Sequence, residues 1–288
     1  MSSLYRDDSY DGAMKKISLL ALSAVSALAI NFLIPAPIAA QEFESVQGSA
    51  LLDGWHTREG TRMAAFHIAL NEGWKTYWRA PGETGIPPRF DWSQSKNIAS
   101  VQFHWPRPGI YNNAGVRTIG YKDELILPVE ITPIDPTQPI ELDVQMQLGV
   151  CEVVCIPVTL NFEGTLNGNN GPAQAQAHIR KALTQRPQSA QAAGINGVRC
   201  AAEPIADGIS LTASLPSGRV GEADIVIFEL PDQQIWISSA QTRREGGKLQ
   251  AQVDMVPPSA TPFALNRSDV RITVIGHDRA VDIQGCRA

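Results

Sequence analysis

The chain has 288 residues, of which 43% are hydrophobic and 18% are charged, and its formal net charge is −5 at pH 7. This acidic balance, together with the lack of a polybasic cluster, argues against nucleic acid or anionic lipid as the main partner. No Ser-His-Asp spacing, phosphate-binding loop or pair of catalytic carboxylates stands out, so the sequence does not support a hydrolase or a nucleotide-binding enzyme.

Residues 1–40 have the pattern of an export signal. Lys15 and Lys16 precede an apolar run over residues 17–34, and small residues follow as far as Ala40. This order of charged, apolar and small residues is typical of a secretory signal peptide. We expect cleavage after Ala39 or Ala40, a periplasmic mature chain and no membrane insertion of that mature chain. If the signal is not cleaved, its apolar run would serve as an N-terminal anchor.

Residues 41–165 alternate short apolar runs with turn residues, as an antiparallel β-sandwich does. Residues 63–70 alternate with a period of two, which predicts a strand. Residues 80–88 and 135–139 are rich in Gly or Pro and interrupt regular structure. The other strands predicted in this region are residues 76–79, 98–105, 125–131, 140–148 and 158–162.

We interpret residues 166–194 as a linker that carries one short helix at residues 173–184. A second, smaller β-sandwich-like domain is predicted over residues 195–288. Its expected strands are residues 209–215, 223–230, 235–240, 249–255 and 270–276, and a hairpin turn is expected at residues 243–248. The predicted fold class is therefore all-β, with two sandwich domains joined by a short helical linker.

The four cysteines of an exported chain indicate two disulfides, and their spacing favours Cys151–Cys155 together with Cys200–Cys286. In the chain-entropy model, a five-residue ring stabilises the fold by only about 2 kcal/mol, whereas the larger ring contributes about 4.6 kcal/mol. We therefore interpret Cys200–Cys286 as a structural bond and Cys151–Cys155 as a reactive one.

Thiol–disulfide exchange requires an attacking thiolate and a nearby thiol that resolves the mixed disulfide. Adjacent cysteines satisfy the second need. The motif contains Glu152 and apolar residues but no Lys, Arg or His, so its surroundings favour a protonated thiol. We expect the pair to react mainly when a partner activates it. Three intervening residues also distinguish it from the Cys-x-x-Cys motif of thioredoxin-like proteins.

Copper is an alternative, because reduced thiols suit Cu(I). A binuclear copper site would want a histidine four positions after Cys155, where the chain has Thr159. His56 and His104 would join such a site only if folding brought them close to the thiols.

Most of the aromatic residues, including Trp74 and Trp105, are expected in the core.

The motifs around the cysteine pair resemble the N-terminal periplasmic domain of DsbD-type thiol:disulfide interchange proteins, especially the ScsB-like branch. The resemblance covers residues 45–165. It rests on the ordered segments 73–82, 87–92, 105–108, 120–129, 149–151 and 155–157, which read GWKTYWRAPG, PPRFDW, WPRP, GYKDELILPV, GVC and CIP.

The resemblance implies an immunoglobulin-like sandwich with the two redox cysteines on neighbouring strands. It implies that Cys155 contacts the partner sulfur and that Cys151 resolves the mixed disulfide. A cap loop shields the pair in the family, which makes Tyr111 the candidate for its tip. A tyrosine close to the pair in the family corresponds here to Tyr77 or Trp78.

The same resemblance implies the partners. The domain would accept electrons from a membrane carrier and pass them to periplasmic thioredoxin-like or disulfide isomerase proteins. The family's membrane domain and C-terminal thioredoxin-like domain have no counterpart in this chain, so we expect the membrane carrier to be a separate protein. The best-known members also space the two cysteines more widely.

Three functions therefore compete. The first is a dithiol–disulfide electron carrier of the protein-disulfide reductase type, with no cofactor and no metal. The second is a non-enzymatic binding module with two structural disulfides. The third is a periplasmic protein that handles Cu(I).

Overall fold

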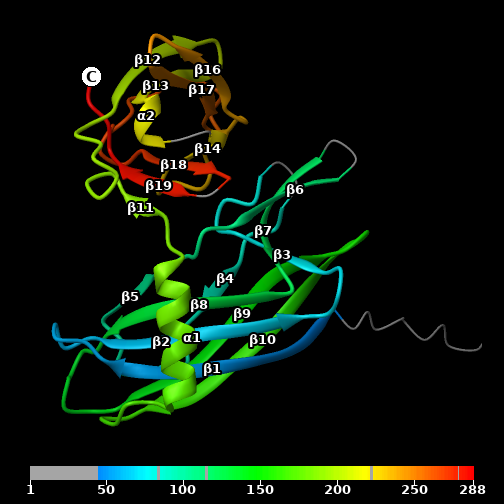
Figure 1. The fold of residues 1–288 in the computed structure, drawn as a ribbon, viewed down its shortest axis with the longest axis vertical. Helices are drawn as coiled ribbons and strands as arrows, with labels where there is room; N and C mark the ends of the chain where they lie inside the picture. Colours follow the sequence, from blue (N-terminus) through cyan, green and yellow to red (C-terminus); the bar gives the residue numbers. More distant parts are fainter. Residues whose placement is uncertain (1–44, 83–84, 114–115, 221–222, 278) are drawn as a thin grey trace, which may run out of the picture. The chain divides into compact units, whose positions relative to one another are not determined.

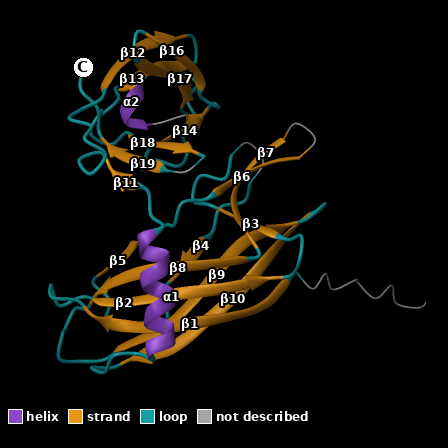
Figure 2. Ribbon diagram, viewed as in Figure 1, coloured by secondary structure: helices purple, strands orange, loops and turns teal. Residues whose placement is uncertain are grey.

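Antiparallel strands dominate the computed structural model of the chain (Figures 1 and 2). The structure describes residues 45–82, 85–113, 116–220, 223–277 and 279–288. Two sheets come from residues 46–166, here called the N-terminal sheet pair, and two more come from residues 188–284, the C-terminal sheet pair. The predicted all-β class is confirmed.

The first sheet of the N-terminal pair has the strand order β1-β2-β8-β5, and the second has the order β10-β9-β3-β7-β6, with β4 pairing with β9. The strands of the first sheet are β1 (Val46–His56), β2 (Arg62–Leu70), β5 (Ser100–Phe103) and β8 (Glu124–Thr132). Those of the second are β3 (Lys75–Tyr77), β4 (Arg89–Asp91), β6 (Gly109–Asn113), β7 (Val116–Lys122), β9 (Ile140–Cys151) and β10 (Cys155–Leu166).

Apolar and polar residues alternate along most of β9, and this pattern explains why the strand forms part of a sandwich. Its apolar side chains point into one core, whereas the polar residues between them are exposed. Phe66 of β2 meets Phe162 of β10 with ring centroids 4.6 Å apart, which joins the two sheets face to face. The inward side chains of β9 are Ile140, Leu142, Val144, Met146, Leu148 and Val150.

Helix α1 (Ala173–Thr184) lies across the outer face of the first sheet (Figure 2). Its Ile179 packs with Met63 and Ala65, which point away from the sandwich core. β2 is therefore covered on both faces, and both of its alternating sets are largely buried. The helix has the bounds that the sequence predicts.

The C-terminal pair consists of the sheets β11-β19-β18-β14 and β12-β13-β17-β15, with β16 pairing with β17. A predicted hairpin turn is present at Gly246 and Gly247, between β16 and β17. The elements are β11 (Gln188–Ser189), β12 (Arg199–Ile205), β13 (Gly208–Pro216), α2 (Ser217–Val220), β14 (Ala223–Glu229), β15 (Trp236–Ile237), β16 (Gln241–Glu245), β17 (Lys248–Val256), β18 (Arg271–Gly276) and β19 (Ala280–Gln284).

Several strand bounds differ from the prediction. The predicted strand 235–240 shrinks to Trp236–Ile237, whereas β9 and β10 extend to the two cysteines. The segment between Trp105 and Gly120, expected to be the cap loop, contributes β6 and most of its paired strand β7. β1 was not predicted, although its residues pair with β2 along nearly their whole length.

The described residues belong to one compact unit, so the domain and linker boundaries drawn from the sequence stay a prediction. The predicted signal at residues 1–40 lies outside the described residues. Within the described part of the chain, no helix has the length and apolar character needed to cross a membrane.

Candidate functional site

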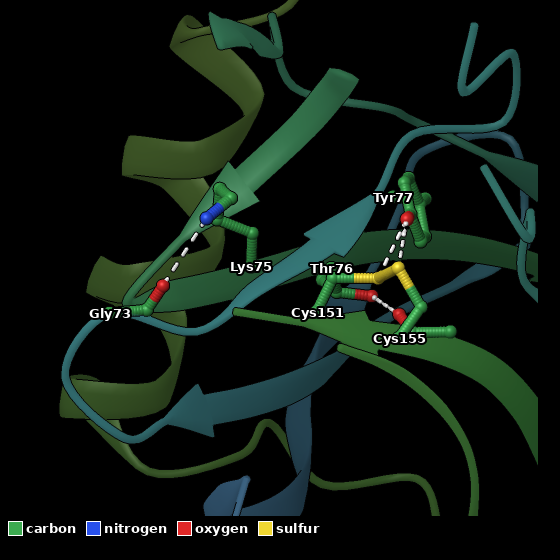
Figure 3. Close-up of a disulfide and its surroundings, with 7 residues drawn as sticks. Gly73, Lys75, Thr76, Tyr77, Cys151 and Cys155 are labelled. Atoms are coloured by element: carbon green, nitrogen blue, oxygen red, sulfur yellow. Dashed lines mark hydrogen bonds between the residues drawn. A yellow bond between two sulfur atoms is a disulfide. The ribbon is translucent and has the colours of Figure 1, made fainter. Parts of the chain in front are cut away.

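The Cys151–Cys155 disulfide lies at one end of the second sheet, where β9 gives way to β10 (Figure 3). The strands pair in antiparallel register with Cys151 opposite Cys155, so the three-residue connection brings the two Cα atoms to 4.1 Å. Both the predicted pairing and the predicted placement on neighbouring strands are present in the structure.

The two cysteines differ in exposure. Cys151 is 5% exposed, whereas Cys155 is an exposed residue. An incoming thiolate must approach the sulfur that it attacks, so access favours Cys155 as the point of attack. This asymmetry agrees with the roles that the family resemblance implies.

Tyr77 covers the disulfide from the neighbouring strand β3. Its hydroxyl oxygen lies 2.7 Å from Sγ of Cys151 and 3.1 Å from Sγ of Cys155 (Figure 3). The register explains this contact, because Lys75 pairs with Cys151 and Tyr77 follows two residues later on the same face of the sheet. Of the two residues considered, Tyr77 therefore contacts the disulfide, whereas Trp78 is fully buried in the sandwich core.

Burial raises the pKa of Tyr77 above its usual value of 10.0. The phenol therefore remains protonated at neutral pH and keeps a proton that it can donate to a sulfur. After reduction, a thiolate at either sulfur position would be a stronger acceptor than the disulfide.

Two glycines make room for the Tyr77 ring. A Cβ atom at Gly149 would lie 2.9 Å from Cε2 of Tyr77 and 2.8 Å from Cβ of Ile86. A Cβ atom at Gly85 would lie 2.7 Å from Cδ1 of Tyr77. The segment at residues 85–86 therefore packs on the tyrosine that contacts the disulfide, and no pattern in the sequence predicts this packing.

Tyr111, predicted as the shielding tip, lies on β6. Its phenol packs against its own strand, because a Cβ atom at Gly109 would lie 2.5 Å from the Tyr111 hydroxyl oxygen. Burial raises the pKa of Tyr111, and a hydrogen bond with the backbone of Lys122 opposes that effect. The structure gives no contact between Tyr111 and the disulfide, and its shielding role stays a prediction.

Lys75 places a positive charge beside the Cys-x-x-x-Cys motif, although the motif itself contains no basic residue. It is the cross-strand partner of Cys151, and its Nζ donates to the backbone carbonyl of Gly73 at 3.3 Å. Glu152 reaches the same place, because its Oε1 would lie 2.7 Å from a Cβ atom at Gly73. Only strand register could have identified Lys75, since 76 positions separate it from Cys151 in the sequence.

The histidines considered for copper have other surroundings. Nε2 of His104 lies 3.0 Å from a Glu130 carboxylate oxygen, and its Nδ1 accepts from Arg186 at 2.8 Å. His56 ends β1 in the other sheet. Among the described residues, no group of three or more His, Cys, Asp or Glu side chains is arranged to hold a metal ion.

The second disulfide joins Cys200 of β12 to Cys286, which follows β19. Its Cα atoms are 5.7 Å apart, and Cys200 is buried in the core of the C-terminal sheet pair. This is the predicted pairing, and it closes a loop that contains nearly all of that sheet pair.

Comparison with known proteins connects the site with a family. Residues 49–167 match the family model described as "Thiol:disulfide interchange protein DsbD, N-terminal". The N-terminal periplasmic domain of ScsB from Proteus mirabilis is similar in structure, with a TM-score of 0.61 and 22% sequence identity. That match covers 87% of this chain and 96% of the ScsB domain.

The reduced DsbD N-terminal domain of Neisseria meningitidis also matches, at 15% identity and a TM-score of 0.26, over 47% of this chain and 96% of that domain. At this score the match adds nothing to the fold assignment. A comparison with curated proteins found no match.

Proposed function

We propose that the chain is a periplasmic thiol–disulfide carrier that works through Cys151 and Cys155, because residues 49–167 match the model of the DsbD N-terminal family. The observation that carries the proposal is the asymmetric disulfide. One sulfur belongs to an exposed residue, the other to a buried residue, and the Tyr77 hydroxyl contacts both.

Exchange on this disulfide proceeds in two displacements. A thiolate of the electron donor attacks Sγ of Cys155, the Cys151–Cys155 bond breaks, and its electron pair remains on Sγ of Cys151. The donor's second thiolate then attacks its own sulfur in the mixed disulfide and releases Cys155. The donor leaves oxidised, and the carrier holds a dithiol after proton uptake.

The reduced carrier passes the two electrons on in the opposite direction. Cys155 attacks the disulfide of an acceptor, and Cys151 resolves the mixed disulfide, which restores the Cys151–Cys155 bond. During both passages the protonated Tyr77 hydroxyl stabilises whichever sulfur carries negative charge. The proposed donor is a separate membrane electron carrier, and the proposed acceptors are periplasmic thioredoxin-like or disulfide isomerase proteins.

The reduction potential of the Cys151–Cys155 pair tests this function. We expect equilibration with a glutathione buffer to give a potential above about −300 mV, the range of exchangeable disulfides. A Cys200→Ala/Cys286→Ala variant isolates the signal of the small ring. A potential well below that value would identify a structural bond and favour the binding-module alternative.

Partner trapping tests the assignment of roles. Cys151→Ser leaves Cys155 able to form a mixed disulfide that cannot be resolved from within the chain, so this variant should accumulate covalent complexes with its partner. Cys155→Ser is the matched control and should accumulate few. The reverse pattern would exchange the roles of the two cysteines.

A further inference from the structure

Lys75 lies in the same cross-strand row as the two cysteines of the small ring. It pairs with Cys151 of β9 on one side and with Lys122 of β7 on the other. Cys151 in turn pairs with Cys155 of β10. Residues directly opposite one another in antiparallel strands point to the same face of the sheet, with Cβ atoms about 5 Å apart. Lys75 is therefore the basic residue next to Cys151 in this row.

The hydrogen bond that Lys75 makes in the oxidised chain is easily exchanged. Its Nζ donates to the backbone carbonyl of Gly73 at 3.3 Å, beyond the usual limit of about 3.2 Å for such bonds. Figure 3 shows the side chain turned toward Gly73 and away from the sulfurs. Because a lysine side chain is a flexible four-carbon stem, its ammonium group can leave this carbonyl for a stronger acceptor nearby.

A stronger acceptor forms at Cys151 when the disulfide opens. A thiolate that bonds to Sγ of Cys155 breaks the bond between the two cysteines and leaves the electron pair on Sγ of Cys151. Cys151 is 5% exposed, so water solvates little of this negative charge. The Tyr77 hydroxyl can donate one hydrogen bond to it. A cation within reach stabilises the charge further.

Glu152 places an opposing charge near the same sulfur. Its carboxylate lies beside Gly73, because Oε1 would be 2.7 Å from a Cβ atom at that position. Glu152 is exposed, whereas Lys75 is half-buried. Solvent and salt screen an exposed charge more strongly than a half-buried one, so the field of Lys75 dominates at Cys151.

We propose that Lys75 is the counter-ion of the Cys151 thiolate during exchange and that it leaves the Gly73 carbonyl when the disulfide opens. This inference rests on the proposed carrier function. Lysine keeps its proton throughout, because its ordinary pKa of about 10.4 lies above the value of about 8.5 for a cysteine thiol. The ammonium charge makes Cys151 a better leaving group, since a more acidic thiol leaves faster.

The Cys155→Ser variant of the full chain isolates the thiol in question. The Cys200–Cys286 bond holds the other two cysteines, so Cys151 alone titrates as a thiol. The ultraviolet absorbance of the thiolate, followed against pH, gives its pKa. Adding Lys75→Gln to this variant should raise that pKa by about one unit, the lower end of the effect of an opposite charge at close range.

Two further variants separate charge from structure. Lys75→Arg keeps the positive charge and should largely preserve the Cys151 pKa of the parent variant. Lys122→Gln removes an equal charge from the same row, but one strand further from Cys151, which adds about 5 Å. It should therefore change the pKa of Cys151 much less than Lys75→Gln does.

The kinetic consequence is measured with both cysteines in place. Dithiothreitol should open the small ring of Lys75→Gln several-fold more slowly than that of the wild type, because the leaving thiolate has lost its counter-ion. Lys122→Gln should react at close to the wild-type rate.

Three results would overturn the role of Lys75. They are an unchanged Cys151 pKa in Lys75→Gln, an equal rise in Lys75→Gln and Lys122→Gln, and an unchanged rate of Lys75→Gln with dithiothreitol. Failure of the carrier function would be recognised separately, by a wild-type reduction potential in the range of structural disulfides. The titration of Cys151 does not depend on that potential.

Discussion

At the scale of single residues, the Tyr77 hydroxyl contacts both sulfurs of the Cys151–Cys155 disulfide. The register of β3 on β9 places the phenol there, and burial keeps it protonated. A neutral donor beside a thiol lowers the thiol pKa, because it stabilises the charged form alone.

Replacing this donor should therefore raise a thiol pKa. In reduced Tyr77→Phe we expect the lower of the two cysteine pKa values to rise by about one unit, the size of one hydrogen bond to a charged group. The thiolate absorbance near 240 nm, followed against pH, measures it. Tyr111→Phe is the control, because that phenol packs against Gly109, and it should leave the titration unchanged. An unshifted titration in Tyr77→Phe would show that the hydroxyl does not stabilise the thiolate.

The residues of the site differ in how far the sequence predicts them. Cys151, Cys155 and their bond follow from spacing alone, because so short a loop closes readily. The choice between Tyr77 and Trp78 depends on which of two adjacent residues at the end of a three-residue strand turns toward the disulfide, and so short a strand has no periodicity to decide it. Lys75 and Ile86 lie far from the cysteines in the sequence and reach them only through strand pairing and packing.

At the scale of elements, a buried histidine connects the first sheet to the end of α1. His104 follows β5, Glu130 lies in β8, and Arg186 comes just after the helix C-cap. Arginine only donates hydrogen bonds, so Nδ1 of His104 must be an acceptor and the ring must be neutral, with its proton on Nε2 facing Glu130. Thr61 donates to the other carboxylate oxygen of Glu130.

This arrangement predicts a loss of stability in acid. Burial lowers the folded-state pKa of His104 below 6.5, and the hydrogen bond from Thr61 lowers that of Glu130 below 4.5. Both groups therefore bind protons more readily when unfolded. The contribution of each group to the free energy of unfolding is complete above its ordinary pKa. It is lost as the pH falls through the lowered folded-state pKa of that group. Urea unfolding at pH 7.5 and at pH 5 should show a smaller unfolding free energy at pH 5.

A substitution identifies the group responsible. His104→Gln removes the titrating ring, so the difference between the two pH values should shrink. His67→Gln is the control, because His67 is also a histidine beside a glutamate, Glu124, but it lies nearer the surface. A pH dependence that persists in full after His104→Gln would place the acid sensitivity elsewhere.

The sequence predicts helix α1 but neither β1 nor the hairpin of β6 and β7, and the difference has a physical cause. The helix at residues 173–184 is rich in alanine and preceded by a proline, so local propensity determines it. β1 contains glycine and polar residues, and it becomes a strand only because β2 supplies its hydrogen bonds. The hairpin of β6 and β7 was expected to be loop for the same reason, since pairing with distant β3 stabilises it.

At the scale of the whole molecule, the two disulfides should contribute unequally to folding. Under the chain-entropy model, Cys200→Ala/Cys286→Ala should lower the unfolding free energy by about 4 to 5 kcal/mol, and Cys151→Ala/Cys155→Ala by about 2 kcal/mol. Guanidinium unfolding of both double variants measures the difference. Equal losses would contradict the division into one structural and one exchangeable bond.

The edge position of β10 has a consequence for turnover. β10 is the last strand of its sheet in the described part of the chain, and the exposed Pro157 comes two residues after Cys155. An edge strand ordinarily invites a visiting chain to continue the sheet, but proline offers no N–H for this. A partner bonded to Cys155 therefore lacks one hydrogen-bond donor close to the turn. For the proposed carrier, this predicts a short-lived complex, so that one molecule could serve successive partners.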